Sequence, residues 1–169
     1  MGQALYPPLL VPSSFKFPRI ADNLAMIPSM LPNTADVTDF SPLWRNAQTI
    51  AVVGLSPKND RPSNRVARYL LSQGFTVIPV NPGHTEILGQ KCYSSLAAIG
   101  HTVDIVDIFR KSEDVPPIVA EAIAIGVKTI WMQEGIVNDA AAALAKSRGL
   151  SVVMDRCLLK EHQRGQEQR

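Results

Sequence analysis

The chain has little cysteine, no long hydrophobic run and almost no net charge. Its two cysteines, Cys92 and Cys157, form no CxxC pair and no metal-ligand spacing with the three histidines. We therefore expect no metal site and no disulfide framework, and a reduced, cytoplasmic setting is favoured. No run of about 18 apolar residues occurs, so a membrane span is not predicted. A formal charge of +2 over 169 residues is too small to indicate a nucleic-acid or membrane partner.

Proline is concentrated at one end of the chain, because residues 1–42 hold seven of the 13 prolines. The stretch ALYPPLLVP is too short and too often interrupted by proline for a signal peptide. We predict an irregular proline-rich extension over residues 1–40, or alternatively a biological start at Met26 or Met30. One domain over residues 41–162 and a polar tail over residues 163–169 are expected to follow, and the domain is expected as a monomer or small homo-oligomer.

The domain alternates short apolar runs with amphipathic segments. The runs TIAVVG, FTVIPV, VDIVDIF, KTIWMQ and LSVVM are typical of strands buried on both faces. Helices are predicted over residues 63–74, 94–99, 114–125 and 138–149, with another beginning near residue 155. This alternation predicts an α/β fold, a Rossmann-type doubly wound five-stranded parallel sheet. The expected strand order is 3-2-1-4-5, which places the ligand site between strands one and four.

The loop after the first strand lies where such folds bind phosphate, yet it contains only one glycine. The segment AVVGLSPKNDRPSNRV has Gly54 followed by serines, prolines and basic residues. We expect Ser63 to be the N-cap of the next helix, whose free backbone N–H groups attract an anion. Lys58, Arg61 and Arg65 add positive charge opposed locally by Asp60. The cluster favours an anion site, although for Ser63 alone a simple capping role is the stronger interpretation.

The residues at the end of the second strand help to indicate which nucleotide ligand binds. NAD-binding folds usually carry a carboxylate there to bind the adenosine ribose. Here that strand ends in Val80, Asn81 and Pro82, with no carboxylate. NAD is therefore disfavoured, and NADP and coenzyme A (CoA) remain.

Several separated blocks together resemble one family. The stretch from GLSPKNDRPSNRVARYLLSQGF to NPGHTEILGQKCYSSL, and then VDIVDIFR, WMQEGIVN and VVMDRC, are similar to the small CoA-binding proteins. These look like the CoA-binding domain at the start of the succinyl-CoA synthetase alpha subunit, standing alone. The resemblance covers residues 41 to about 162 and implies that the ligand is CoA or an acyl-CoA.

The resemblance also implies a set of site residues along the carboxyl edge of the sheet. The diphosphate would lie on the loop from Gly54 to Ser63, the adenosine near the end of strand two, and the pantetheine near the ends of strands three and four. The implied cofactor-binding residues are Gly54, Leu55, Ser56, Lys58, Arg61, Pro62, Ser63, Val80, Asn81, Pro82, Phe109, Arg110, Gln133, Gly135, Ile136 and Cys157.

The same comparison argues against catalysis by this chain alone. The synthetase needs a second domain with a phosphorylated histidine, and we expect no catalytic residue here. His84, His101 and His162 are interpreted as solvent-facing. Asp104 and Asp107 are interpreted as pairing with basic neighbours, although they would also be able to polarise a site.

Two further classes and one side chain leave alternatives open. An NADP-dependent oxidoreductase would use the same phosphate loop but needs a proton donor and a substrate domain. A redox-sensing regulator would need a helix-turn-helix arm, which the proline-rich first 40 residues do not resemble. Cys157 is either an inert, packed thiol or a neighbour of the CoA thiol, able to form a mixed disulfide with it.

Overall fold

The computed structural model describes residues 39–167, so most of the predicted extension over residues 1–40 lies outside the described residues. No helix among the described residues is long and apolar enough to cross a membrane. The elements are, in chain order, α1 (Ser41–Asn46), β1 (Thr49–Val53), α2 (Pro62–Ser72), β2 (Thr76–Val80), β3 (Glu86–Ile87), β4 (Gln90–Lys91), β5 (Ile105–Ile108), the 3-10 turn η2 (Ser112–Asp114), α3 (Val115–Ala124), β6 (Thr129–Met132), α4 (Asp139–Ser147), β7 (Ser151–Val153) and α5 (Leu158–Glu167).

The main sheet is parallel and has five strands in the order β2-β1-β5-β6-β7. The predicted α/β class is confirmed, but the predicted strand order is wrong. Counted along the chain, the five strands run 2-1-3-4-5 instead of 3-2-1-4-5. The third predicted strand, β5, therefore lies beside β1 and not beyond β2.

Proline in β2 explains why this strand ends the sheet. The carbonyl of Pro79 points away from β1 and accepts a hydrogen bond from Tyr93 N at 2.9 Å. The nitrogen of Pro79 faces the same outer side and has no hydrogen to donate, so a full neighbouring strand is disfavoured there. This signal was present in the sequence and points to an edge strand.

Asp104 fastens the start of β5 to the start of β1. Its Oδ2 accepts hydrogen bonds from Gln48 N at 2.9 Å and Thr49 N at 3.1 Å, while Oδ1 pairs with Lys128 Nζ at 2.7 Å. Burial alone would raise the pKa of Asp104, but Lys128 and the two N–H groups together hold it below its ordinary value. The expected pairing of this acid with a basic neighbour is confirmed.

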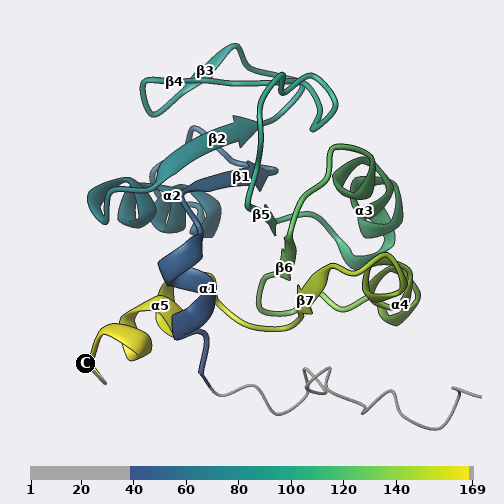
Figure 1. Cartoon of the computed structure of the whole chain (residues 1–169). Coiled ribbons are helices and arrows are strands. Elements are labelled where there is room, and N and C mark those ends of the chain that lie inside the picture. Colours follow the sequence, from purple (N-terminus) through teal and green to yellow (C-terminus); the bar gives the residue numbers. More distant parts are fainter. Residues whose placement is uncertain (1–38, 168–169) are drawn as a thin grey trace, which may run out of the picture. The chain divides into compact units, whose positions relative to one another are not determined.

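Helices cover both faces of the sheet (Figure 1). One buried cluster packs α1, α2 and α5 against the sheet around Ile50, Leu70 and Trp131, and the other packs α3 and α4 around Val106 and Ile130. The strands β1, β5 and β6 are almost wholly buried, as expected for a sheet covered on both faces.

The connection from β2 to β5 differs from the prediction. The expected helix over residues 94–99 is absent, and these residues form bends and turns. A small antiparallel hairpin, β3–β4, precedes them and lies beside β2 in Figure 1. Leu96 and Ile99 still pack into the core, so this segment is buried without helical hydrogen bonding.

Two histidines lie at the surface as expected, and the third does not. His84 and His101 are exposed, whereas His162 is buried in α5. A hydrogen bond joins its Nδ1 to the hydroxyl of Tyr69 at 2.8 Å, and its ring packs edge-on against Trp44 and Phe75. The solvent-facing interpretation of His162 is wrong because α5 returns to pack on α1 and α2.

Asp107 lies in the middle of the core and forms no ion pair with any of the described residues. Its side chain is fully buried on β5, and its Oδ1 accepts a hydrogen bond from Gln133 Nε2 at 2.7 Å. No partner is recorded for Oδ2 among the described residues. Burial raises the pKa of Asp107 to about 7, although the Gln133 bond opposes the rise. The expected pairing with a basic side chain is wrong for this residue.

This raised pKa predicts a pH-dependent stability. The folded state holds the proton up to about pH 7, whereas the unfolded carboxyl loses it near its ordinary pKa of 3.8. The contribution of the Asp107 carboxyl to the free energy of unfolding is therefore fully present below pH 3.8. It is lost as pH rises towards 7, by several kcal/mol. We expect the free energy of unfolding of Asp107→Asn, measured by urea denaturation, to rise relative to wild type between pH 4 and pH 7. A constant difference would contradict the assignment.

Candidate functional site

The carboxyl ends of the parallel strands meet at one edge of the sheet. Because β5 lies beside β1, the connections diverge between these two strands and not between strands one and four as predicted. Open α/β sheets bind ligands at this divergence. The segments after β1 and β5 are therefore the centre of the candidate site.

Gly54 ends β1 at the point where the chain after β5 passes closest. Its φ is +84°, and a Cβ built there would lie 3.0 Å from both the Phe109 carbonyl oxygen and Arg110 Cδ. Both the backbone conformation and the close approach require glycine. The single glycine of the loop thus serves strand packing at the site as well as the turn.

The rest of the loop is held by its own serines. Ser63 Oγ accepts a hydrogen bond from Ser56 N at 3.1 Å, and Ser56 Oγ accepts one from Lys58 N at 3.2 Å. The predicted capping role of Ser63 is wrong: Arg61 is the N-cap of α2, and Ser63 is buried inside its first turn. Asn64 Nδ2 also donates to Ser56 O at 2.8 Å. These bonds give the loop a defined shape without a glycine triplet.

Three basic side chains project from this loop and the first turn of α2. Lys58, Arg61 and Arg65 are exposed, and within residues 39–167 none of them forms an ion pair. The positive end of the α2 dipole adds to their charge. This part of the edge therefore attracts an anion.

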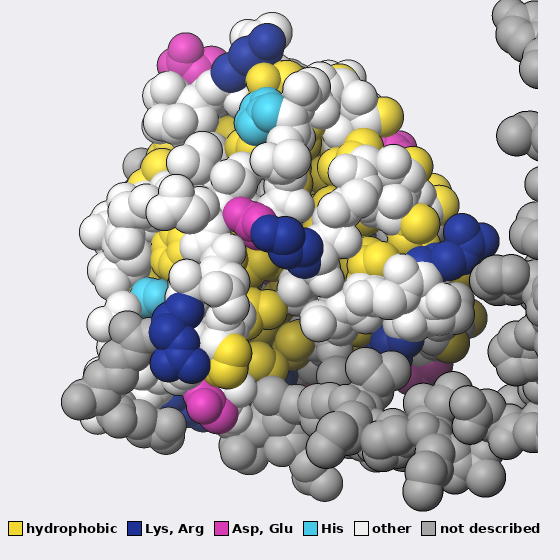
Figure 2. Space-filling model, viewed as in Figure 1, with side chains coloured by type: hydrophobic (Ala, Val, Ile, Leu, Met, Phe, Trp, Pro, Cys, Tyr) yellow, Lys and Arg dark blue, Asp and Glu magenta, His cyan; other side chains and the backbone are white. Residues whose placement is uncertain are grey.

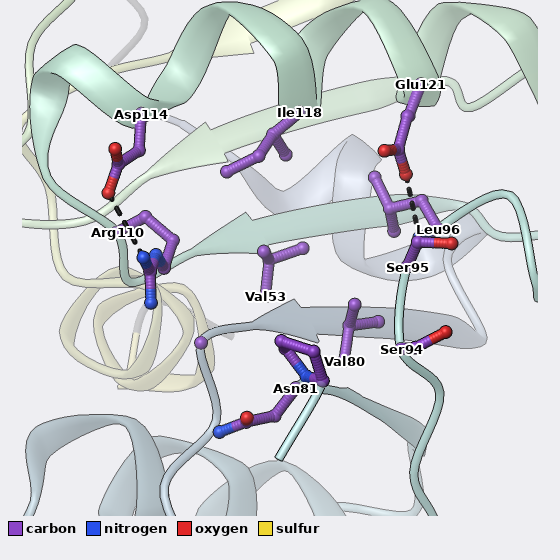
Figure 3. A pocket seen from close by; sticks show the side chains of 12 residues that line it. Val53, Val80, Asn81, Ser94, Ser95, Leu96, Arg110, Asp114, Ile118 and Glu121 are labelled. Atoms are coloured by element: carbon purple, nitrogen blue, oxygen red, sulfur yellow. Dashed lines mark hydrogen bonds and ion pairs between the residues drawn. The ribbon is translucent and has the colours of Figure 1, made fainter. Parts of the chain in front are cut away.

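A cavity of about 300 Å³ opens on the α3 side of this edge (Figure 3). Arg110 lines it and pairs at 3.2 Å with Asp114, which also lines it. Both side chains are largely exposed, so the pair is worth at most about 1 kcal/mol and Arg110 is available to a stronger anion. The lining residues are Val53, Gly54, Val80, Asn81, Pro82, Ser94, Ser95, Leu96, Arg110, Asp114, Ile118 and Glu121.

Two other polar side chains of this cavity, Asn81 and Glu121, already form hydrogen bonds. Asn81 donates to Leu55 O at 3.0 Å through Nδ2 and accepts from Gly83 N at 3.0 Å through Oδ1. Glu121 Oε2 accepts from Leu96 N at 3.0 Å. Asn81 therefore connects the end of β2 to the loop after β1. It also leaves this strand end without the carboxylate that is typical of NAD-binding folds.

A larger cavity, of about 630 Å³, opens on the α2 and α5 side. Phe109, Ile136 and Leu159 give it apolar walls, and Lys160 Nζ pairs with Glu134 Oε1 at its border at 2.7 Å. Cys157 lines it and is half-buried. The lining residues are Pro62, Arg65, Val66, Phe109, Gln133, Glu134, Ile136, Cys157, Leu159, Lys160 and Gln163.

The two cavities meet the same short segments. Phe109 lines the larger one and Arg110 the smaller, while Gly54 lines the smaller and Pro62 the larger. The basic loop therefore runs from one cavity to the other. Figure 2 shows the view of Figure 1 in space-filling form, with basic and acidic side chains scattered over the visible face and no large patch of one sign.

The structure divides the predicted site residues into three groups. The smaller cavity takes Gly54, Val80, Asn81, Pro82 and Arg110, and the larger takes Pro62, Phe109, Gln133, Ile136 and Cys157. Neither cavity is lined by Leu55, Ser56, Lys58, Arg61, Ser63 or Gly135. Leu55 is fully buried in the core, and Gly135 forms a turn in which its N–H donates to Asp155 Oδ1 at 2.7 Å.

Sequence reasoning missed several lining residues. Ser94 and Ser95 reach the smaller cavity because the segment after the β3–β4 hairpin crosses the edge, and the expected helix there concealed this. Leu159, Lys160 and Gln163 reach the larger cavity because α5 packs beside α2. The only sequence signal for this helix was its amphipathic pattern, which does not say where it docks.

Comparison with known proteins connects this geometry to a family. A family model described as a CoA binding domain matches residues 48–163. The Bacillus subtilis protein YneT, described as uncharacterized, is 37% identical over 131 residues, which are 78% of this chain and 95% of that protein. The solved structure of a hypothetical protein from Pyrococcus horikoshii OT3 is 40% identical, with a TM-score of 0.71, and the match covers 73% of this chain and 87% of that one.

A longer relative carries the same domain as a small part. The ADP-forming acetate–CoA ligase I of Archaeoglobus fulgidus is 29% identical over 121 residues, which are 66% of this chain but 18% of the ligase. The resemblance noted in the sequence is thus confirmed both for stand-alone chains and for a domain of a CoA ligase. With most of the described residues inside the matched span, this chain belongs to the CoA binding domain family.

Proposed function

We propose that this chain binds coenzyme A, or an acyl-CoA, along the carboxyl edge of its sheet in the cytoplasm, without itself catalysing a reaction. The observation that carries the proposal is the unpaired basic loop that runs between two cavities of different character. CoA has the same sequence of parts: an adenosine end, a diphosphate, and a long, mostly uncharged pantetheine arm.

The parts of CoA are assigned by charge and polarity. The diphosphate lies beside Lys58 and Arg61, where the dipole of α2 and the unpaired cations favour negative charge. The adenosine enters the smaller cavity beside Pro82 and the end of β2. The pantetheine follows Phe109 into the larger cavity and brings its thiol towards Cys157.

The absence of catalysis remains part of the proposal. Three of the ionisable side chains that border the cavities have partners: Arg110 pairs with Asp114, Lys160 pairs with Glu134, and Glu121 accepts from backbone N–H groups. His162 is packed between aromatic rings and bonded to Tyr69. The histidine is thus held in the core, and the exposed cations at the cavities suit a bound anion, which supports a binding role.

The first prediction concerns the choice of ligand. We expect CoA to raise the melting temperature more than NADP, and NAD to have little effect, at equal concentrations in differential scanning fluorimetry. A ligand that binds only the folded state at a hundredfold excess over its Kd stabilises by about 2.7 kcal/mol. A larger shift with NADP would favour the oxidoreductase alternative and contradict the proposal.

The second prediction concerns Arg61. Arg61→Ala should weaken CoA and dephospho-CoA equally, by about 1.5–3 kcal/mol, because we place the guanidinium on the diphosphate. Isothermal titration calorimetry measures both affinities. A selective loss for CoA would move Arg61 to the 3′-phosphate, and no loss for either ligand would refute the basic-loop argument. Arg148→Ala is the matched control, because Arg148 is exposed at the end of α4 and lines neither cavity.

The third prediction concerns Cys157. Treatment with CoA disulfide should give a mixed disulfide at Cys157, its thiolate displacing one CoA as the free thiol. Peptide mass spectrometry locates the adduct, which should be absent in Cys157→Ser. Cys92 is the internal control, since it is buried, its Sγ donates to Asn81 O, and burial raises its pKa. Modification of Cys92 alone, or of neither thiol, would leave Cys157 as a packing residue.

A further inference from the structure

The buried carboxyl of Asp107 requires an explanation that stability does not supply. A buried acid without a cation costs stability, and buried polar groups are normally fully hydrogen-bonded. Its register partners Val52 and Trp131 are themselves fully buried. Asp104, three residues earlier on the same segment, satisfies both of its oxygens with Lys128 and backbone N–H groups. Asp107 has the single bond to Gln133.

Gln133 connects this carboxyl to the larger cavity. It follows β6, is 4% exposed and lines the cavity. Its Nε2 is held by Asp107 at 2.7 Å, so the carbonyl oxygen is the atom that the amide has left to offer to the cavity. Above its pKa of about 7 the Asp107 carboxyl is ionised. An ionised carboxylate only accepts hydrogen bonds, so it then selects this one orientation of an amide that is otherwise free to flip.

The character of the cavity makes that oxygen important. Phe109, Ile136 and Leu159 form apolar walls, and burying an amide N–H among such side chains without a partner costs stability. The pantetheine arm of CoA contains secondary amides, each of which must find an acceptor when it leaves water. A fixed carbonyl oxygen at this position would provide one.

We propose that Asp107 is a positioning residue: it holds the Gln133 amide so that its carbonyl oxygen accepts an N–H from an amide in the arm of the ligand. This inference rests on the proposed function. Asp107 does not touch the ligand. Through Gln133 it would favour an arm that contains amides over a plain hydrocarbon chain.

The test compares two ligands that share the nucleotide end. CoA carries the arm, and adenosine 3′,5′-bisphosphate lacks it. Affinities are measured by isothermal titration calorimetry at pH 8 for wild type, Gln133→Met, Asp107→Asn and the double variant. Methionine matches the length of glutamine without an acceptor, and asparagine matches the shape of aspartate but tolerates both amide orientations.

We expect Gln133→Met to weaken CoA by about fivefold to tenfold, the value of one hydrogen bond, and to leave the bisphosphate unchanged. Asp107→Asn should weaken CoA alone, by about twofold to fivefold, because one of the two amide orientations presents the wrong polarity. The double variant should match Gln133→Met, since Asp107 acts through Gln133. Asp104→Asn, a control on the same segment, should change thermal stability without changing the ratio of the two affinities.

Three outcomes would overturn the inference. Equal losses for both ligands would give Asp107 a merely structural role. Unchanged CoA affinity in Gln133→Met would show that Gln133 accepts no hydrogen bond from the ligand. This result is informative even when Asp107→Asn does not fold. A further loss when Asp107→Asn is added to Gln133→Met would show that Asp107 acts by another route. Failure of the proposed function is distinct, because wild type itself would then fail to bind CoA.

Discussion

The site depends on the close approach of the chain after β5 to Gly54 at the end of β1. A Cβ at residue 54 would meet the Phe109 carbonyl and Arg110 at 3.0 Å, so the absence of a side chain at residue 54 allows the chain after β5 to lie this close to the end of β1. That approach places Phe109 in one cavity and Arg110 in the other. The basic loop, which begins at Gly54, therefore connects the two cavities directly.

A second constraint is the set of polar contacts made by Asp104 at the opposite end of the same strands. Asp104 joins the starts of β5 and β1 through two backbone N–H groups and Lys128. It fixes the strand neighbours, and Gly54 fixes how closely their carboxyl ends meet. Asp107, between these points, has no such structural partner, and its contact with Gln133 is directed towards the larger cavity.

Much of the fold could be predicted because local signals were strong. Continuous apolar runs marked the buried strands. The helix predicted over residues 138–149 begins as expected, because the side chain of Asn138 caps α4 by accepting from Ala141 N at 2.9 Å. The observed strand order has a local signal at Pro79, whose missing N–H favours an edge position for β2, but the apolar runs by themselves do not specify which strands are neighbours. Ser63 was misplaced because Pro62, which has no N–H, already occupies the first helical position and makes Arg61 the cap.

The sequence alone determined the strand and helix pattern, the single-glycine loop with its basic residues, and the family, because these are encoded by neighbouring residues. Only the tertiary structure decided which distant segments face the ligand edge. Ser94 reaches the smaller cavity from the irregular connection between β4 and β5, and Leu159 reaches the larger cavity from α5. His162, on the same helix, is buried where α5 packs on its neighbours. The physical reason is that local pattern specifies which face of an element is buried, whereas docking between elements depends on the shape and polarity of partners far away in the chain.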